Sequence, residues 1–360
     1  MKQINNWIKA VILILVIIFP IDQAIAGNEQ RSGQAGASEL LINPWARTSG
    51  WASSNIAGVR GLEGMYSNVA GLAFTEKTEL IFTQTSWLQY GNKMFSANDA
   101  VSTISSFGFS QKVGESGALG LSVMNMDFGQ IGITTVDLNE GGLGTFAPSF
   151  MNIALSYAKI FSNSIYGGMT VRMISEQISN VAANGVALDA GIQYVTGAKD
   201  NLKFGIALKN VGPRMSFTGD GLSFRGIVGD DDDYKMTVEE RSSNFELPAL
   251  LNMGMSYDII ALRHRVTGAG TFTSNSFQKD QYRLGCEYAY NDMFMVRTGY
   301  TYEKGIRDPK TRSTALRGPS AGFTVELPMR TNGGTFGLDY SYRHTDPFQG
   351  SHTIGARINL

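Results

Sequence analysis

The stretch QYRLGCEYAY, residues 281–290, indicates the class of fold. Tyrosine, leucine and cysteine side chains alternate in it with Arg283, Glu287 and two small residues. Because successive side chains of a strand point to opposite faces, this segment has one apolar face and one polar face. The same period of two recurs in the segments 151–157, 186–194, 202–209, 294–302, 323–327, 336–343 and 351–360. Many such strands in succession, with aromatics on the apolar face, are typical of a barrel with lipid outside and water inside.

About fourteen such strands fit between Glu79 and Leu360, so we expect an all-β antiparallel transmembrane barrel over residues 79–360. The expected joints alternate in length. Short ones lie near residues 114–117, 162–164, 197–201, 260–262, 291–292 and 330–334, and long ones near 88–98, 126–149, 176–184, 213–247, 304–318 and 345–350. Such barrels have short periplasmic turns and long extracellular loops. Since the first joint is long and the strand number even, we expect both termini in the periplasm and the long loops at the cell surface.

Residues 1–26 have the three parts of a secretory signal peptide. Lys2 and Lys9 precede an apolar run over residues 10–19, and Ala24-Ile25-Ala26 offers a cleavage site before Gly27. The alternative is an anchor helix, but the run is too short to span a bilayer. We therefore expect the mature chain to begin near Gly27.

Residues 27–78 do not follow the strand pattern. They are rich in glycine, alanine and serine, too polar to face lipid, and long for a loose tail. We expect them to form a plug inside or under the barrel, with one or two short helices. A flexible periplasmic extension is the alternative.

Composition excludes several classes of function. The net charge of -1 implies no nucleic-acid partner, and the single cysteine, Cys286, excludes a disulfide framework. The three histidines form no complete zinc site, and no G-x-S-x-G, H-E-x-x-H or P-loop motif occurs, so we expect no catalytic residues, no metal and no cofactor. The run Asp230–Asp233 lacks the spacing of a calcium loop and is expected to be a solvated loop tip rather than a cation site.

Several motifs in the chain carry a resemblance to a known family. They are ASELLI with NPWAR at residues 37–47, GLEGMYSNVAGLA at 61–73, ISE at 174–176, GVALDAGIQY at 185–194, LKNVG at 208–212 and MSFTGDGL at 215–222. By these the chain resembles the PorV/PorQ family of the type IX secretion system, within the FadL-like barrel class. It departs from the family at Val69, where proline is usual, and at Leu360, where such barrels commonly end in an aromatic residue.

The resemblance implies a fourteen-stranded outer-membrane barrel of a Bacteroidota-type bacterium that acts as a carrier. Such a carrier takes secreted proteins from a translocon barrel by their C-terminal signal domain and passes them to a sortase-like attachment complex. There the cargo is released or joined to surface lipopolysaccharide, and the carrier does no covalent chemistry. The residues alone leave a FadL-like channel for hydrophobic small molecules as the alternative, and a structural porin as a third.

Two sets of residues are candidates for function. Aromatic and apolar residues of the long loops are expected to bind cargo, because exposed apolar loops often mark interfaces: Trp87, Tyr90, Phe128, Phe146, Phe217, Leu222, Phe224, Tyr234 and Phe245. The alternative is that these loops pack on themselves, or that Trp87 and Tyr90 belong to an aromatic girdle. Inward charges are expected to pair across the lumen and close it rather than line a conducting path: Arg172, Asp189, Arg283, Glu287, Arg297, Glu326, Asp339, Arg343 and Arg357, with Lys203 and Lys209.

Overall fold

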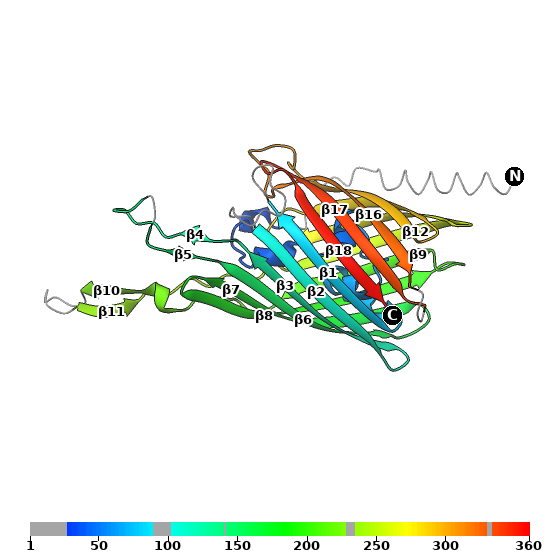
Figure 1. Cartoon of the computed structure of the whole chain (residues 1–360), viewed down its shortest axis with the longest axis horizontal. Coiled ribbons are helices and arrows are strands. Elements are labelled where there is room, and N and C mark those ends of the chain that lie inside the picture. The colour runs from blue at the N-terminus through cyan, green and yellow to red at the C-terminus, as the bar shows by residue number, and fades with distance from the viewer. Residues whose placement is uncertain (1–26, 89–101, 140–141, 228–234, 330–332) are drawn as a thin grey trace.

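A computed structural model describes residues 27–88, 102–139, 142–227, 235–329 and 333–360 (Figure 1). The predicted signal peptide, Tyr90, Tyr234 and the run Asp230–Asp233 lie outside these residues. Among the described helices, none is long and apolar enough to cross a membrane.

Fourteen antiparallel strands of the described chain close into a barrel, as the alternating pattern predicts. Each strand pairs with its neighbours along the chain, and β18 returns to pair with β1, from Glu79 opposite Asn359 to Ser86 opposite His352. The strands are β1 (Thr78–Trp87), β2 (Ser102–Val113), β3 (Gly117–Asp127), β6 (Ser149–Ile160), β7 (Ile165–Ile178), β8 (Val181–Thr196), β9 (Leu202–Val211), β12 (Leu250–Ala261), β13 (His264–Asn275), β14 (Gln281–Tyr290), β15 (Phe294–Glu303), β16 (Leu316–Pro328), β17 (Thr335–Thr345) and β18 (Ser351–Asn359).

The two faces of the wall differ as the sequence pattern predicts. In β14, Leu284 is 57% exposed on the outer face, whereas Glu287 is 1% exposed on the inner face. Cys286 also lies on the outer face. Exposed leucine, isoleucine, phenylalanine and tyrosine side chains recur on the outer face of the other strands. Such a surface is suited to lipid, so the barrel is of the membrane-spanning type.

The two ends of the barrel differ in the length of their connections. At one end, here the short-turn end, neighbouring strands are joined by tight turns such as the one between Val113 and Gly117. At the other, the long-loop end, β3 and β6 are more than twenty residues apart, as are β9 and β12. Two small hairpins project from this end (Figure 1): the first arm, β4 (Ile131–Gly132) with β5 (Thr145–Phe146), and the second arm, β10 (Ser223–Ile227) with β11 (Lys235–Glu239), which η5 (Asp220–Leu222) precedes.

The long joint predicted over residues 176–184 is wrong. Strands β7 and β8 continue past the barrel wall and meet in a two-residue turn, in which Ser179 has a positive φ of 51°. Ala182 in this extension also exchanges two backbone hydrogen bonds with Thr218, at 2.9 and 3.0 Å. The polar residues of this stretch therefore belong to strands that continue beyond the membrane into water. They do not indicate that the strands end there.

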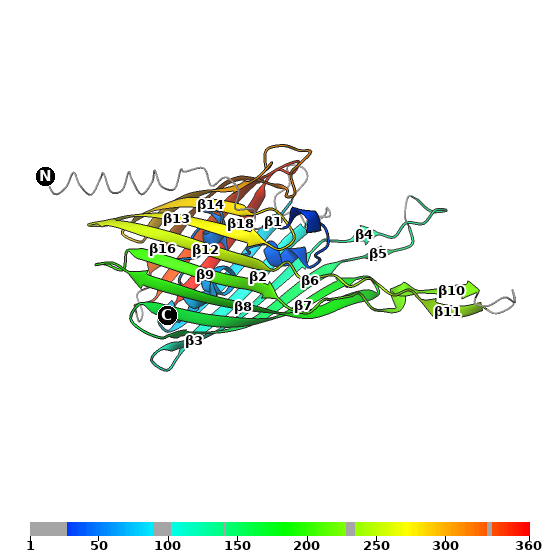
Figure 2. The ribbon, with the colours of Figure 1, turned by 180° about the vertical axis from the view of Figure 1, so that it is seen from behind.

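Residues 27–77 form a plug of short helices, and most of it is buried inside the barrel (Figure 2). Its helices are η1 (Glu29–Arg31), η2 (Ser38–Leu41), α2 (Ala46–Ser49), η3 (Gly61–Glu63), α3 (Gly64–Ser67) and η4 (Val69–Phe74). At Val69, where the resembled family usually has proline, the Asn68 side chain caps η4 by accepting a hydrogen bond from Ala70 N at 3.2 Å. The Asn68 amide also donates to the carbonyls of Ile56 and Ile192, both at 3.1 Å, and so ties the plug to β8.

Inward-facing glycines of the wall let the plug backbone approach closely. A Cβ at Gly254 would lie 2.6 Å from Ile56, and one at Gly120 would lie 2.6 Å from the sulfur of Met65. At Gly299 a Cβ would overlap the backbone of Trp51. Because these contacts come from several strands, the plug is seated around most of the barrel's circumference.

The described chain begins and ends at opposite ends of the barrel. The Gly27 nitrogen contacts Asp280 in the connection between β13 and β14, at the long-loop end. Leu360 bonds to Thr78 at the start of β1, at the short-turn end. The expectation that both ends of the mature chain lie on the same side is therefore wrong, because the plug enters from the long-loop end and threads the whole lumen before β1 begins.

Candidate functional site

A cavity of about 540 Å³ lies at the long-loop end, between the plug and the wall. Its apolar side is built from Ile42 of the plug and from Trp87, Met126, Phe128 and Phe150 of the wall and loops. The Phe128 and Phe150 rings pack edge to face with centroids 4.9 Å apart. Aromatic and thioether side chains of this kind suit an apolar ligand.

Trp87 lies in this cavity and not on the outer girdle. It continues the inward series of β1 after Thr83 and Thr85. The Arg343 guanidinium lies 5.0 Å from the centre of its ring, within the range of a cation–π contact. The strand period places Trp87 inward because β1 extends to this residue. The sequence alone does not show where β1 ends, so the inward position of Trp87 could not be predicted.

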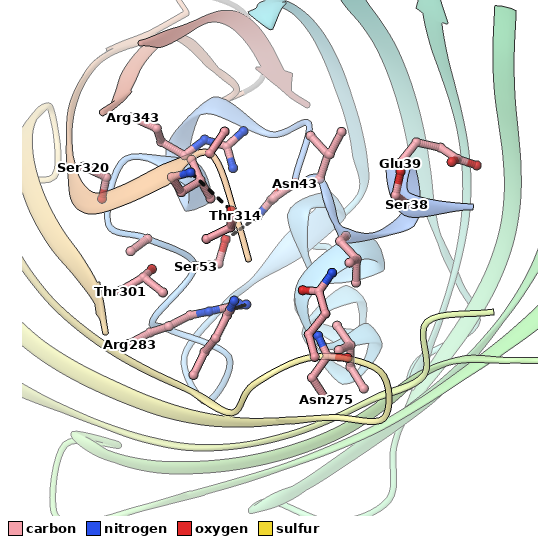
Figure 3. A pocket seen from close by; sticks show the side chains of 18 of the residues that line it. Ser38, Glu39, Asn43, Ser53, Asn275, Arg283, Thr301, Thr314, Ser320 and Arg343 are labelled. Atoms are coloured by element: carbon pink, nitrogen blue, oxygen red, sulfur yellow. Dashed lines mark hydrogen bonds between the residues drawn. The ribbon is translucent and has the colours of Figure 1, made fainter. Parts of the chain in front are cut away.

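Three cations line the same cavity: Lys209 of β9, Arg283 of β14 and Arg343 of β17. Figure 3 shows Arg283 and Arg343 directed toward the same space. In the described part of the chain, none of the three has a carboxylate within ion-pair distance. Arg283 donates to Gln281 at 2.7 Å, and Lys209 lies 3.6 Å from the Tyr66 ring centre. Arg343 is only 9% exposed, and its Nε and Nη2 atoms have no hydrogen-bond partner among the residues that the structure describes.

The floor of the cavity is held by hydrogen bonds within the plug. The Asn43 amide donates to Thr48 at 2.9 Å and to Ser53 at 2.8 Å, and the second of these bonds is drawn in Figure 3. The Tyr66 hydroxyl donates to the Leu40 carbonyl at 2.7 Å. These residues lie in the segment predicted to be a plug, but no motif marked them as part of a site.

Glu39 of η2 also faces this cavity, with both carboxylate oxygens buried beside the Glu176 carboxylate. Burial, and then the neighbouring Glu176 carboxylate, raise the pKa of Glu39 to about 8, against a smaller opposing effect of Arg172. The side chain is therefore mostly protonated near neutral pH.

Other inward charges form pairs across neighbouring strands. Arg172 contacts Asp189 at 2.9 Å and Glu287 contacts Arg297 at 2.8 Å. Both pairs join adjacent strands of the wall, and they do not reach across the lumen as was expected of them. Three more predicted residues join such networks: Arg357 contacts Glu326 at 2.7 Å, and Asp339 accepts a hydrogen bond from Thr324. Of the nine inward charges predicted, Arg283 and Arg343 are the two that have no acidic partner among the described residues.

A second cavity of about 540 Å³ lies at the short-turn end, and its lining is charged. There Lys203 pairs with Asp258, and Arg265 contacts Glu287 at 3.0 Å and Asp292 at 2.8 Å. The plug stretch from Trp51 to Asn55 separates this cavity from the one at the long-loop end.

The remaining loop residues predicted for cargo binding fall into two groups. Phe217 and Phe245 pack together, with centroids 5.7 Å apart, over Met215 and Leu247. They cover the plug, so for this pair the alternative of self-packing describes the structure. Phe224 is 53% exposed on the second arm, with Leu222 partly exposed before it, and Phe146 is partly exposed on the first arm.

In the described part of the chain, no group of three or more histidine, cysteine, aspartate or glutamate side chains could hold a metal ion.

Comparison with known proteins places the fold. No family model matches the chain, and no curated protein matches it by sequence. The structure is similar to that of the CymD monoaromatic hydrocarbon channel, with a TM-score of 0.54 at 14% identity, over 88% of this chain and 97% of that one. The chain has a FadL-like barrel.

Two further solved structures agree with this fold. A FadL homologue of Pseudomonas aeruginosa has a TM-score of 0.50 at 12% identity, over 87% of this chain and 96% of that chain. The toluene transporter TodX of Pseudomonas putida has a TM-score of 0.50 at 13% identity, over 84% and 94%. Two of the three are a hydrocarbon channel and a toluene transporter, and at such low identities the likeness establishes the fold alone.

Proposed function

We propose that this protein binds hydrophobic molecules that carry an anionic group, and transports them across the outer membrane with its long loops at the cell surface. The observation that carries the proposal is the cavity at the long-loop end, where an aromatic wall meets three cations that have no acidic partner in the described chain. The transport of hydrocarbons by proteins of the same fold supports it. Of the two functions weighed from the sequence, the FadL-like channel has the better support.

The need for an anionic group follows from the cost of buried charge. A cation removed from water is stabilised only if it is paired or hydrogen-bonded. Arg343 is buried with two donor atoms unmet, and Lys209 is buried against the face of Tyr66. A carboxylate or phosphate between Lys209, Arg283 and Arg343 would satisfy these donors, while its apolar chain would lie on Trp87 and Phe128.

The route out of the cavity is proposed to pass through the wall. The seated plug closes the axial path. Beside the cavity, the pairing of β16 with β17 is irregular, because the register shifts between Leu316 and Ser320. Gly318 has a φ of 106° there, and Leu316, Gly318 and Ser320 all line the cavity. A bulge of this kind disrupts the ladder between two strands locally, so we place the exit from the cavity there.

Binding of three probes of equal chain length tests this proposal. We expect dodecanoate and dodecyl phosphate to bind the purified protein at least about tenfold more tightly than the neutral dodecanol, since charged hydrogen bonds contribute about 1.5–3 kcal/mol. Arg343→Met should remove that preference and leave dodecanol binding unchanged. Arg214→Gln, at an exposed loop residue, is the matched control. Failure of all three probes to bind would overturn the proposal.

A second function, the type IX carrier, is favoured by the two projecting arms. Phe224 and Met236 lie on one face of the second arm and are both 53% exposed, far from the barrel wall. Exposed apolar faces of this kind often bind proteins. The proposed partners are secreted proteins with a type IX C-terminal signal domain, the translocon barrel, the sortase-like attachment complex and outer-membrane lipopolysaccharide.

Deletion of residues 218–244 separates the two functions. If the protein is a carrier, the barrel should stay heat-modifiable on a gel while capture of purified cargo signal domain is lost. If the cavity is the functional site, the same deletion should leave dodecanoate binding in place. Intact cargo capture by the deletion variant would defeat the assignment of cargo binding to this loop.

A further inference from the structure

Gly27, the residue directly after the predicted cleavage site, is tightly packed and hydrogen-bonded at the long-loop end. The Gly27 nitrogen donates to Asp280 Oδ2 at 2.7 Å. A Cβ on residue 27 would lie 2.8 Å from both the nitrogen and the Oδ1 atom of Asp280, and 2.9 Å from the Gln278 carbonyl oxygen. Only glycine fits without a shift of this backbone.

The residues that follow Gly27 are held by the same connection between β13 and β14. Asn28 N donates to the Asn275 carbonyl at 3.4 Å, and Glu29 contacts Lys279 at 3.4 Å. The Arg31 guanidinium lies 4.3 Å from the centre of the Phe277 ring. Asn28, Glu29 and Arg31 thus each contact this part of the barrel, in addition to Gly27.

The connection itself is held firmly in place. Phe277 is buried, and its nitrogen donates to the Asn275 side chain at 3.0 Å. Lys279 is buried as well, and donates to the carbonyls of Lys304 at 3.1 Å and Thr311 at 2.6 Å. Asp280 therefore projects from a rigid base and not from a loose loop.

Cleavage changes the chemistry at this position. Hydrolysis of the Ala26–Gly27 peptide bond by signal peptidase consumes one water and leaves a carboxylate on Ala26 and an α-amino group on Gly27. That amine is mostly protonated at neutral pH, since such groups have a pKa of about 7.7–8.0. A neutral amide hydrogen bond to Asp280 then becomes a charge-assisted one, which is about twice as strong.

We propose that Asp280 is the receptor for the α-ammonium group of the mature chain, so that removal of the signal peptide locks the N-terminal segment across the mouth of the barrel. This segment leads to Glu39 and Ile42, which line the cavity. Processing of the precursor therefore completes one wall of the cavity. The mature N-terminus lies at the long-loop end, opposite Leu360.

The first measurement is the N-terminal sequence and intact mass of the protein from outer membranes, which should begin at Gly27. The second is the rate of reductive methylation of the α-amine, read by mass spectrometry of the N-terminal peptide. We expect Asp280→Asn to raise this rate about tenfold or more, because the variant keeps an oxygen acceptor and loses the charge. Asp137→Asn, on an exposed residue of the first arm, should react like the native protein.

A second variant guards against a merely structural effect. Gly27→Ala keeps the α-amine and Asp280, but its methyl group cannot enter the space beside Asp280 and Gln278. Its α-amine should also be methylated faster, and hydrogen exchange of residues 28–42 should rise. A mature chain that begins elsewhere, or an amine that reacts equally fast in the native protein and in Asp280→Asn, would overturn the proposal.

Discussion

The two ends of the barrel hold cavities of equal volume, about 540 Å³ each, with opposite chemistry. At the short-turn end Lys203 pairs with Asp258, and Arg265 pairs with Glu287 and Asp292. At the long-loop end Arg283 and Arg343 have no acidic partner in the described chain, and they face aromatic side chains. Inward-facing charged side chains therefore have two roles in the same lumen. Paired charge holds the wall and plug together, and unpaired charge is available to a ligand.

The largest expected effect comes from removing the barrier between the two cavities. Gly299→Val places a side chain where the Trp51 backbone lies, and overpacking of a closed site costs about 1–3 kcal/mol or more. We expect the plug to be displaced and the ionic conductance in planar bilayers to rise well above that of the native protein. Gly268→Val is the matched control, since nothing lies within 4 Å of a Cβ there. Unchanged conductance of Gly299→Val would mean that the plug does not close the lumen.

The second prediction compares a paired with an unpaired arginine. Arg297 is fully buried, and contacts Glu287 and Thr324, each at 2.8 Å. Arg297→Met should reduce the free energy of unfolding by about 3–5 kcal/mol, because it leaves Glu287 buried with less compensation. Arg343→Met, without ligand, should be near neutral or stabilising, because it removes a buried cation that has no counterion. Urea unfolding in lipid vesicles measures both. An equal loss of unfolding free energy in both variants would contradict the proposed difference between the two ends.

The third prediction concerns pH at the long-loop end. The pKa of Glu39 is about 8 in the folded chain, against an ordinary value of 4.5. A raised pKa favours the folded state at low pH, so this stabilisation is present below about 4.5 and is lost as the pH rises through about 8. The protection factors of residues 37–42, which are exchange rates corrected for their intrinsic pH dependence, should therefore fall between pH 6 and pH 9. Glu39→Gln should flatten that fall, and a steep fall in the variant would point to another group.

The smallest effect is expected on the second arm, which lies outside both cavities. Phe224→Ser changes an exposed side chain, so the free energy of unfolding should stay within about 0.5 kcal/mol of the native value. Dodecanoate binding should also be unchanged. A loss of dodecanoate binding would mean that the arm and the cavity act as one site.

Much of the fold could be predicted because the deciding pattern is local. Alternation in residues 281–290 is enough to place Leu284 outside and Glu287 inside, whatever the rest of the chain does. The same rule failed at residues 176–184, where strands leave the membrane and the apolar side chains that mark them end first. The site was less predictable. Trp87 was chosen as a loop residue, and its place in the cavity wall depends on where β1 ends.

The sequence by itself determined the strand period, the barrel class and a segment too polar to be part of the wall. Each of these depends on neighbours a few residues apart. The pairing of the inward charges depended on the tertiary structure, because Arg297 contacts Glu287 through the register of two strands, whereas Arg343 contacts no acidic side chain among the described residues. The tertiary structure also decided that the plug enters from the long-loop end, with Gly27 against Asp280, residues 253 positions apart in the chain. Contacts between such distant residues depend on the closure of the whole barrel. A pattern of neighbouring residues in the sequence cannot predict them.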